Sequence, residues 1–553
     1  MRVHRPLSLI IALLALASPA RADDRQKLAD LFAPALKAGG TVTIPPGDYH
    51  LDGVDPLPVP SNTTVSAYGA RFHFPAKLGD RARAVMFAGK DVSDLRWFGG
   101  HFAGRVFDPA RDDNPWEPNA NTRGIVVTTS PGGRTANLTF RDVTSDGLAG
   151  AAITVLGAEK PGSDREVTTY AENVTVENCT LERTGKFMWD YGLLWQYTVW
   201  PDDYGDRERA LAAKYFRNEL VRGPVKLEAG DDRVPLDNAA KPLTVSKEVT
   251  GAQADRGIGA VCFFGDALPS NLVRGRQYFV VESAPGHIKV AEKPGGEPIR
   301  FASAGGPNVR MVSDLFAATL ALYQPTGAGP GKGAVDVVAA KHVIVRGCRL
   351  SALGDTMHLQ KCDGIVFADN HVTGSRMGAF FLAEYCRNAT VTGNTVDGTN
   401  GSRVISVEKS CRDVTMVGNT FRGGGRGSWI NQPTNFVLAD NVFEDNTTKC
   451  EPDPKRGRRS FLTGGYERYA ELYFTTHEPG GKYGNVIVRG NVFTSGAHAT
   501  AAITFAPGGD TVVVTGNVFA GPVREIRVAD GCANVAVRDN SGAPPPTSAP
   551  AAR

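Results

Sequence analysis

One short motif recurs along the chain, and its spacing constrains the fold more than any other feature. The motif is close to Val-x-Val-x-x-Asn, and neighbouring copies lie 22 to 26 residues apart, apart from one interval of 50 that fits two copies with an insertion. The aligned asparagines are Asn370, Asn394, Asn419, Asn441, Asn491, Asn517 and Asn540, with Asn178 and Cys348 at the equivalent place in earlier copies. A period of this length indicates a solenoid or a propeller, whose units bury their apolar faces only against one another.

The repeats have the pattern of strands rather than helices. In DTVVVTGNVF at 510–519, as in other copies, β-branched residues dominate and partly alternate with polar ones. A leucine-rich repeat has a similar period but needs leucines at fixed places, where these copies use Val, Ile, Phe and Thr. We therefore expect an all-β chain folded as a right-handed parallel β-helix. The asparagine would make the turn, because Asn tolerates the left-handed backbone conformation, and amides stacked about 4.8 Å apart could bond along the column.

Four cysteines form a second column, each eight residues before an aligned asparagine. They are Cys362, Cys386, Cys411 and Cys532. Disulfides are one interpretation, because stacked coils bring Cα atoms within bridging range. Parallel side chains on stacked strands nevertheless keep their Cβ atoms about 4.8 Å apart, which is longer than a disulfide prefers, so we expect a column of buried thiols. The chain has no paired cysteine or histidine spacing typical of a zinc site.

The sequence divides into five parts. Arg2 and Arg5, an apolar run and the small residues before Asp23 have the layout of a cleaved signal peptide, which predicts a secreted protein, extracellular or periplasmic. The expected parts are a signal peptide at 1–22, a cap and first coils at 23–203 with an amphipathic helix at 25–38, an inserted helix and small β domain at 204–312, the main coils at 313–541, and a disordered Pro/Ala-rich tail at 542–553.

Charge and hydropathy restrict the partners. The 61 basic and 58 acidic residues give a net charge of +3, which falls to zero once the three arginines of the signal peptide are removed. This balance offers no argument for nucleic acid or for a membrane surface. No apolar run after the signal peptide reaches the roughly 18 residues of a membrane span. The expected partner is a polysaccharide, and the oligomeric state stays open.

The candidate site is the column ten residues before the aligned asparagines. Successive coils place Gln360, Glu384, Lys409 and Asn431 there, so an acid, a base and two amides would share one strip of surface. The residues beside this column are Tyr385, Lys361, His358, Glu408, Arg403 and Gln432. The alternative is a surface ion pair between Glu384 and Lys409 with no further role.

A dense aromatic segment precedes the predicted insertion. FMWDYGLLWQYTVWPDDY at 187–204 contains Trp189, Trp195 and Trp200, whose flat faces could stack on sugar rings. The alternative is a hydrophobic plug between the insertion and the coils.

Two resemblances follow from these motifs. The entry segments GTVTIPPGDYHL and LPVPSNTTVSAYGARFHF, with the repeat, resemble the pectin-lyase-like β-helix superfamily, which contains pectate lyases, polygalacturonases and phage tailspikes. VISVEKSCRDVTMVGNTF at 404–421 resembles polysaccharide lyase family 6, the family of chondroitinase B and alginate lyase. That second resemblance implies Lys409 as the base of a β-elimination. The family's arginine one coil later is replaced by Asn431 or Gln432, so Arg403, Arg426 or a calcium ion would substitute for it.

Three functions remain open from the sequence. The first, slightly favoured, is elimination from a uronate-containing glycan, with Lys409 as base, Tyr385 or His358 as acid and Arg403 near the substrate carboxylate. The second is hydrolysis by Glu384 and Glu408, which needs two carboxyl groups at a suitable separation. The third is a non-catalytic glycan-binding or adhesin-like solenoid. No cofactor is implied apart from the candidate calcium ion.

Overall fold

A computed structural model gives the architecture of the chain. It describes residues 24–51, 55–74, 83–104, 121–160, 166–185, 221–222, 224–236, 243–246, 259–265, 267–273, 276–313, 333–352, 355–375, 378–398, 403–448, 470–476 and 480–549. The predicted signal peptide at 1–22, the aromatic segment with Trp189, Trp195 and Trp200, and the predicted helix of the insertion lie outside the described residues. No helix among the described residues is long and apolar enough to cross a membrane.

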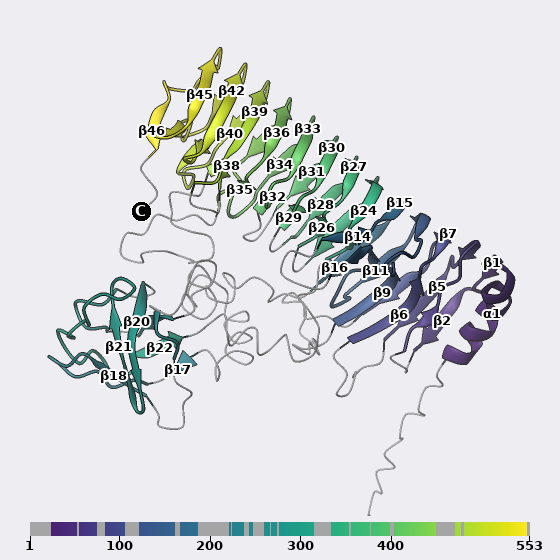
Figure 1. Ribbon diagram of the computed structural model, residues 1–553, viewed down its shortest axis with the longest axis horizontal. Coiled ribbons are helices and arrows are strands. Elements are labelled where there is room, and N and C mark those ends of the chain that lie inside the picture. Colours follow the sequence, from purple (N-terminus) through teal and green to yellow (C-terminus); the bar gives the residue numbers. More distant parts are fainter. Residues whose placement is uncertain are drawn as a thin grey trace, which may run out of the picture.

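The described coils form a parallel β-helix with three long sheets, here called A, B and C (Figure 1). Sheet A contains β1 (Gly40–Thr43), β4 (Thr63–Ser66), β7 (Ser93–Phe98), β10 (Ala136–Arg141), β15 (Ala171–Glu177), β24 (Ala340–Arg346), β27 (Asp363–Ala368), β30 (Arg387–Thr392), β33 (Arg412–Val417), β36 (Thr434–Ala439), β39 (Tyr483–Arg489), β42 (Gly509–Thr515) and β45 (Ala533–Arg538). Sheet B contains β2 (Gly47–His50), β5 (Ala70–His73), β8 (His101–Ala103), β11 (Thr144–Asp146), β16 (Thr180–Thr184), β25 (Arg349–Ala352), β28 (His371–Thr373), β31 (Thr395–Asp397), β34 (Thr420–Arg422), β37 (Val442–Glu444), β40 (Val492–Thr494) and β43 (Val518–Ala520).

Sheet C completes each coil and carries the residues of most interest. It contains β3 (Leu57–Pro58), β6 (Arg83–Lys90), β9 (Asn121–Thr128), β12 (Ile153–Leu156), β23 (Val335–Val338), β26 (Met357–Gln360), β29 (Gly378–Ala383), β32 (Arg403–Val407), β35 (Ser428–Asn431), β38 (Ala470–Thr475), β41 (Ala501–Phe505), β44 (Ile526–Ala529) and β46 (Thr547–Ala549). Each strand pairs in parallel with the equivalent strand of the next coil, so the predicted right-handed parallel β-helix is confirmed.

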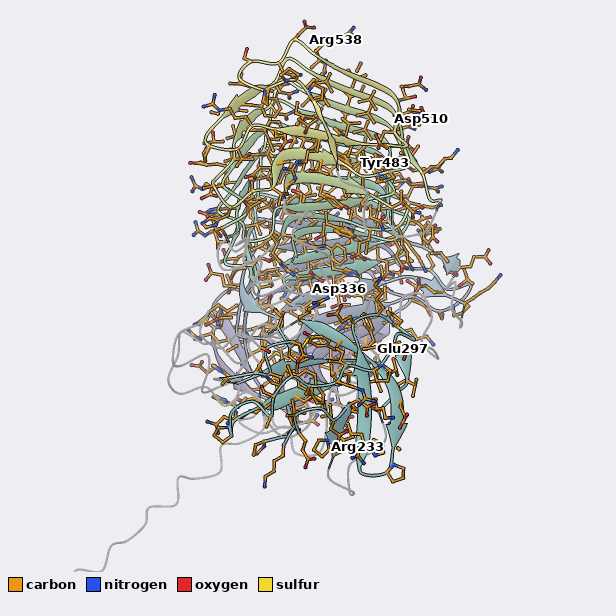
Figure 2. All side chains as sticks on the ribbon, turned by 90° about the vertical axis from the view of Figure 1, so that its left-hand side faces the viewer. Arg233, Glu297, Asp336, Tyr483, Asp510 and Arg538 are labelled. Atoms are coloured by element: carbon orange, nitrogen blue, oxygen red, sulfur yellow. The ribbon has the colours of Figure 1, made fainter. Side chains whose placement is uncertain are left out.

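The core lies inside the coils, where apolar side chains of equivalent positions stack on one another. On sheet B the rings of Phe421, Phe443, Phe493 and Phe519 follow at centroid distances of 5.1, 4.9 and 4.9 Å. This repeated spacing is close to the separation of neighbouring strands, so one residue type is used again in each coil. Figure 2 shows the stacked coils from the side, with Asp336 at mid-height and Tyr483 and Arg538 nearer the C-terminal end.

The column of asparagines forms a continuous hydrogen-bonded ladder at the corner between sheets A and B. From Asn370 to Asn540, each Nδ2 donates to the Oδ1 of the next asparagine at 2.8–3.0 Å. The predicted bonding along the column is therefore confirmed. The left-handed residue is instead the one before each asparagine, such as Gly393 at φ 66° or Asp369 at φ 55°. The two positions therefore have different tasks. Gly or Asp adopts the left-handed backbone conformation, and the Asn side chain satisfies the hydrogen-bonding groups of the corner.

The earliest member of this column differs by one residue from the sequence alignment, whereas Cys348 takes its aligned place. The backbone N–H of Cys348 donates to Asn370 Oδ1 at 2.9 Å, and the N–H of Cys179 points to Cys348 Sγ at 3.4 Å. Cys179, rather than Asn178, is therefore the equivalent residue. Asn178 occupies the left-handed position before it, with φ 53°.

The cysteine column contains thiols, as predicted. Cys362, Cys386, Cys411 and Cys532 are all free, and the first three are fully buried. Burial raises the pKa of the thiols of Cys362 and Cys386 well above its ordinary value, because a thiolate is poorly solvated there. These sulfurs are core atoms rather than nucleophiles.

Helix α1 (Arg25–Ala38) covers the N-terminal end of the solenoid and matches the predicted range. Leu28, Phe32 and Ala35 are buried on its inner side, and the ring of Phe32 lies 6.3 Å from that of Trp97. The helix thus closes an apolar end that would otherwise be open to water.

The inserted region contains an antiparallel sheet with a core of its own. Its strand order is β17 (Val221–Arg222), β22 (Arg310–Ser313), β19 (Ala260–Phe264), β20 (Gln277–Ala284), β21 (His287–Ala291) and β18 (Arg233–Pro235). It interrupts one coil between β16 of sheet B and β23 of sheet C. The short hairpin β13 (Ala158–Glu159) and β14 (Val167–Thr169) projects between sheets C and A.

The expectation of a disordered tail at 542–553 is wrong for part of it. Thr547–Ala549 form β46, which pairs in parallel with β44 from Arg527↔Thr547 to Ala529↔Ala549. Without the tail, β44 would be the last strand of sheet C and its outer backbone groups would have no partners. The tail supplies these partners as β46.

Candidate functional site

Three sequence-predicted residues meet at the corner between sheets C and A. Glu384 accepts a hydrogen bond from Gln360 Nε2 at 2.8 Å through Oε2, and one from Lys409 Nζ at 2.9 Å through Oε1. These residues come from three successive coils and are called the corner row below. The predicted convergence of an acid, a base and an amide at this corner is present for these three residues.

The charges of the corner row are matched to one another. Burial would raise the pKa of Glu384, but the hydrogen bonds from Lys409 and Gln360 outweigh it and lower this pKa below its ordinary value. The hydrogen bond to Glu384 raises the pKa of Lys409, whose side chain is 54% exposed. A base must be neutral before it can take a proton, so this ion pair works against Lys409 in that role.

Asn431 does not belong to the corner row, because two coils carry one extra residue at this corner. Strand pairing aligns Gln360 with Ala383, and Val407 with Ile430. In the coils of β29 and β32, Glu384 and Lys409 therefore lie one residue beyond the column that holds Gln360 and Asn431.

Asn431 faces outward from sheet C and is completely buried. Its amide nitrogen and oxygen have no hydrogen-bond partner among the described residues. An unsatisfied buried amide costs free energy, and such sites are commonly completed by water or by a ligand. Glu408, which is half-buried, takes the outward position of the preceding coil, and Gln432 makes the turn after Asn431 with φ 52°.

The remaining predicted neighbours have separate surroundings. Tyr385 is 55% exposed at the corner with φ 60°, beside Glu384 in sequence. Lys361 is buried and its Nζ lies 2.7 Å from Glu159 Oε1, which ties the β13–β14 hairpin to the corner.

A second row of residues runs along the outer face of sheet C, two residues before the column of Gln360 and Asn431. Strand pairing aligns Asp336, His358, Phe381, Ser406, Trp429, Tyr473 and Thr504. We call this the outer row. Its members are only 4–7% exposed although they point away from the core. Outward side chains of a solenoid ordinarily meet water, so this low exposure distinguishes the outer row.

The first part of the outer row holds a histidine and a carboxylate in contact. His358 Nδ1 lies 2.8 Å from Asp336 Oδ1, and both side chains are 6% exposed. Arg123 Nη1 lies 3.7 Å from Asp336 Oδ2 and 3.4 Å from Thr154 Oγ1. An Nδ1–H donated to Asp336 fixes the imidazole tautomer that carries its lone pair on Nε2.

The next part of the outer row is aromatic. The guanidinium of Arg403 stacks over the ring of Trp429 at 4.8 Å, and the rings of Trp429 and Tyr473 are 5.6 Å apart. The imidazole of His358 and the ring of Phe381 are 5.3 Å apart. The outer row thus combines an imidazole–carboxylate pair with aromatic rings, and the arginines Arg123 and Arg403 contact it.

Of these residues, His358 and Arg403 were predicted from the sequence, whereas Asp336, Arg123, Trp429 and Tyr473 were not. Counting a fixed number of residues back from each asparagine fails in the coils of β29 and β32, where the corner is one residue longer. The usable signal was the strand alternation itself, since Asp336, His358 and Tyr473 each stand between two buried apolar residues.

One buried carboxyl group lies apart from the outer row. Glu471 in β38 is fully buried and accepts hydrogen bonds from the backbone N–H and Nδ2 of Asn446. Burial raises its pKa to about 7, because the hydrogen bonds from Asn446 only partly offset the loss of solvation. Gly424 N–H donates to Asn446 Oδ1, so the whole cluster is internal to the solenoid.

The described coils repeat three parallel sheets around one apolar core. The chain therefore has the parallel β-helix fold that its repeat predicted. A family model described as periplasmic copper-binding protein (NosD) matches residues 326–452, which is less than half of the chain. No curated protein sequence matches at a significant level.

Several solved structures are similar over most of their length. The A-module of the Azotobacter vinelandii mannuronan C-5 epimerase AlgE6 is 13% identical with a TM-score of 0.48, covering 95% of this chain and 96% of that one. The Streptococcus pneumoniae surface protein and adhesin PfbA is 12% identical with a TM-score of 0.43, covering 94% of each chain. Endo-xylogalacturonan hydrolase from Aspergillus tubingensis is 11% identical with a TM-score of 0.37, covering 95% and 98%. All three TM-scores lie below one half, so they carry no argument about function.

The description of the matching family raises the question of a metal. Among the residues that the structure describes, no group of three His, Cys, Asp or Glu side chains is placed to hold an ion. The thiols of Cys362, Cys386 and Cys411 lie against backbone carbonyl oxygens inside the core. The described donor set therefore does not fit a copper site. The calcium ion considered above stays a prediction.

Proposed function

We propose that this protein cleaves a uronate-containing polysaccharide by β-elimination on the outer face of sheet C, with His358 as the proton-transferring residue. The observation that carries the proposal is the buried His358–Asp336 pair, 2.8 Å apart, beside Arg123. It stands in one row with an aromatic surface, as a site for an extended chain of sugars requires.

The chemistry assigns a task to each group. Elimination requires removal of the proton on C5, next to the uronate carboxylate, and His358 Nε2 is the candidate acceptor because Asp336 holds the other nitrogen. Arg123 is the candidate to neutralise the carboxylate, which makes the C5 proton more acidic. The electron pair of the C5–H bond then forms the C4–C5 double bond while the C4–O bond breaks. The departing oxygen takes a proton, which the imidazolium can return.

Other groups on this face are suited to binding. The orphaned amide of Asn431 offers two donors and an acceptor to sugar hydroxyl groups. Trp429 and Tyr473 offer flat faces, with Arg403 stacked on the first of them. Neighbouring strands are about 4.8 Å apart, so one glycan lying along the row would meet these residues one after another.

Hydrolysis is less well supported by the placement of carboxylates. Asp336 and Glu408 on the outer face lie three coils apart, about 14 Å, whereas glycosidases separate their two carboxyl groups by about 5 to 9.5 Å. Glu384 has both oxygens engaged and a lowered pKa, the opposite of what a general acid requires. Lys409 as the base, which the sequence resemblance implies, stays a prediction that the same assay tests.

A single assay separates the candidate reactions. The protein is incubated in deuterated buffer with a panel of uronate polymers, and three signals are read: ultraviolet absorbance of an unsaturated uronate, new reducing ends, and deuterium at C5. Elimination predicts absorbance together with reducing ends. Reducing ends without absorbance would establish hydrolysis, deuterium alone would show proton exchange without cleavage, and binding without any signal would favour the adhesin-like alternative.

Variants link the reaction to the site. His358→Gln and Asp336→Asn are expected to abolish the absorbance, while His371→Gln in β28 is the matched control on another sheet. If the polymer is still cleaved at full rate by His358→Gln, the proposed site is wrong.

A further inference from the structure

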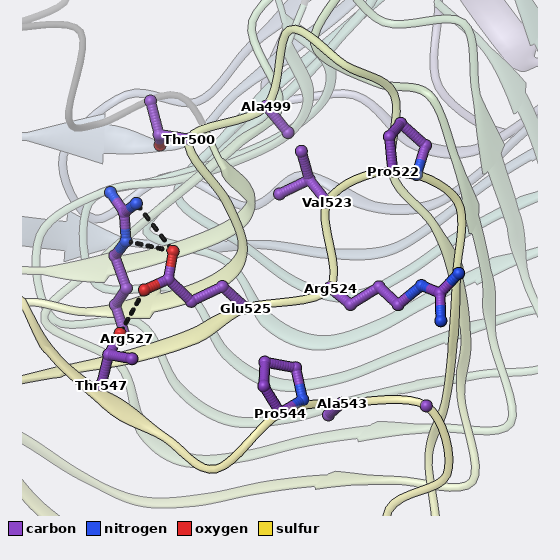
Figure 3. A pocket seen from close by; sticks show the side chains of 11 residues that line it. Ala499, Thr500, Pro522, Val523, Arg524, Glu525, Arg527, Ala543, Pro544 and Thr547 are labelled. Atoms are coloured by element: carbon purple, nitrogen blue, oxygen red, sulfur yellow. Dashed lines mark hydrogen bonds and ion pairs between the residues drawn. The ribbon is translucent and has the colours of Figure 1, made fainter.

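A pocket of about 900 Å³ lies at the C-terminal end of sheet C (Figure 3). Its lining residues are Ala499, Thr500, Pro522, Val523, Arg524, Glu525, Arg527, Gly542, Ala543, Pro544 and Thr547. The pocket exists because the tail folds back as β46, so that Gly542 to Thr547 form one wall. Its volume falls within the range of about 300 to 1,000 Å³ that is usual for sites of small ligands.

The charged groups of the pocket are two arginines and one carboxylate. Arg527 Nε and Nη2 donate to Glu525 Oε2 at 2.9 and 2.7 Å, and Thr547 Oγ1 donates to Glu525 Oε1. Arg524 Nε donates to the carbonyl oxygen of Gly521 at 2.8 Å, and Arg524 has no acidic partner among the described residues. Figure 3 shows Arg524 and Arg527 on opposite sides of the pocket. The lining therefore carries one positive charge in excess.

Apart from the hydroxyl groups of Thr500 and Thr547, the rest of the lining is apolar. Val523 and Pro544 lie on either side of Glu525 between the two arginines (Figure 3). A few charged groups on an apolar lining suit a ring-shaped ligand that bears an anionic group, since the ring packs on the lining and the anion pairs with guanidinium.

The pocket continues the outer row. Strand pairing aligns Thr504 with Arg527, and Arg527 with Thr547. Six strand intervals separate β26, which holds His358, from β44, which holds Arg527. At about 4.8 Å for each interval this is about 29 Å along the solenoid. A polymer that lies along the outer row from His358 towards the C-terminus would arrive at this pocket.

We propose that the pocket is a remote subsite that binds one acidic sugar residue of the polysaccharide through Arg524, the lining arginine that is not paired with Glu525. The proposal rests on the proposed function for the identity of the polymer. Its consequence is a dependence on chain length, because only an oligosaccharide that spans about 29 Å occupies both the His358 region and the pocket. Shared binding of one chain at two places raises the overall affinity without a new contact at either place.

The test measures binding rather than turnover, so that the two proposals can fail separately. Full-length protein carrying His358→Gln is titrated calorimetrically with uronate oligosaccharides of increasing length, with neutral oligosaccharides and with sulfated ones. Arg524→Gln is the variant, because Arg524 is exposed and its loss leaves no buried partner. Arg538→Gln is the matched control, an exposed arginine on β45 of sheet A.

The expected result is selective in length and in charge. Arg524→Gln is expected to raise the Kd for long acidic oligosaccharides about tenfold and to leave the Kd for short ones unchanged within error. Arg538→Gln is expected to leave the Kd unchanged for every length. Tighter binding of the uronate series than of the sulfated series assigns the anion as a carboxylate, and the reverse assigns it as a sulfate.

Two results would overturn the subsite. One is equal affinity of the Arg524→Gln variant and its parent for every length, and the other is an equal loss for short and long chains. If no uronate polymer is cleaved by the wild type but long chains still bind in an Arg524-dependent way, the proposed function fails while the subsite stands.

Discussion

The asparagine ladder and the outer row are built in the same way but differ in what they use. Each takes one residue from each coil and stacks it on the next. In the ladder every rung is the same amide, and donors and acceptors saturate one another from Asn370 to Asn540. In the outer row the residue changes at every coil, from Asp336 to His358, Phe381 and Ser406. A column that keeps one residue type is explained by the structural needs of the solenoid. A column whose residue type changes from coil to coil is not explained by those needs.

The contrast is sharpest in polar satisfaction. Asn419 Nδ2 donates to Val391 O and Asn441 Oδ1, both at 2.9 Å, and its Oδ1 accepts from Asn394. Asn431 is an equally buried asparagine, yet its amide has no partner among the residues that the structure describes. The same side chain is thus satisfied in the ladder and unsatisfied on the face of sheet C, where a water molecule or a ligand could complete its hydrogen bonds.

The largest expected effect is on catalysis in the outer row. His358→Gln should lower turnover of a uronate polymer on the order of 1,000-fold, as loss of a proton-transferring group does, with a midpoint of unfolding close to that of the parent. The Gln side chain can still donate a hydrogen bond to Asp336, so a loss of turnover without a loss of stability would report on proton transfer and not on packing. Steady-state kinetics and thermal unfolding measure the two effects, and a drop of less than tenfold would remove His358 from the reaction.

The opposite effect is expected in the ladder. Asn419→Val should lower the free energy of unfolding by about 4 kcal/mol, because it strands buried donors and acceptors on both neighbouring rungs. Turnover per folded molecule should not change. Denaturant titration gives the loss of stability, and Asn388→Gly is the control, since Asn388 is exposed and its φ of 55° suits glycine.

The buried carboxyl of Glu471 predicts a pH dependence of stability. Its pKa in the folded chain is about 7, above the ordinary 4.5, so between these two pH values the folded state binds more protons than the unfolded state. Stability should therefore fall as pH rises from about 4.5 to 7, by about 3 kcal/mol in total. Glu471→Gln should flatten this fall, and denaturant midpoints at several pH values measure it. An unchanged slope would mean that another group is responsible.

The smallest effect is expected at the corner row. Lys409→Gln and Glu384→Gln should each change stability by less than about 1 kcal/mol, because solvent screens this exposed pair. The contribution of Glu384 is present above its ordinary pKa of 4.5 and is lost as pH falls through its lowered folded value, while that of Lys409 is lost only above its raised pKa. A double-mutant cycle measures the coupling. If Lys409→Gln abolishes cleavage as completely as His358→Gln, the lysine base implied by the sequence resemblance is restored.

The repeat made most of the fold predictable. Strand alternation and the period gave the β-helix, the spacing of eight gave the column of thiols, and the amphipathic pattern gave α1 over Arg25–Ala38. The tail was expected to be disordered because Pro and Ala carry no strand signal. Thr547–Ala549 nevertheless form a strand, since β44 offers backbone partners that no local pattern reveals.

The candidate site was only partly predictable, because a fixed number of residues along the chain does not always lead to the equivalent position in the next coil. Gln360, Glu384 and Lys409 do come together, but Asn431 separates from them through one extra corner residue in two coils. Asp336 lies 22 residues before His358, one coil away, and Arg123 lies on the other side of the insertion, so no local motif joins the three.

The sequence by itself determined which residues stack. A solenoid needs similar side chains at the same place in each coil, so its period is visible as a sequence repeat. Only the tertiary structure decided which stacked column could do chemistry. Burial, the tautomer-fixing contact of His358 with Asp336 and the unsatisfied amide of Asn431 depend on the register between coils, which is not encoded within a single repeat.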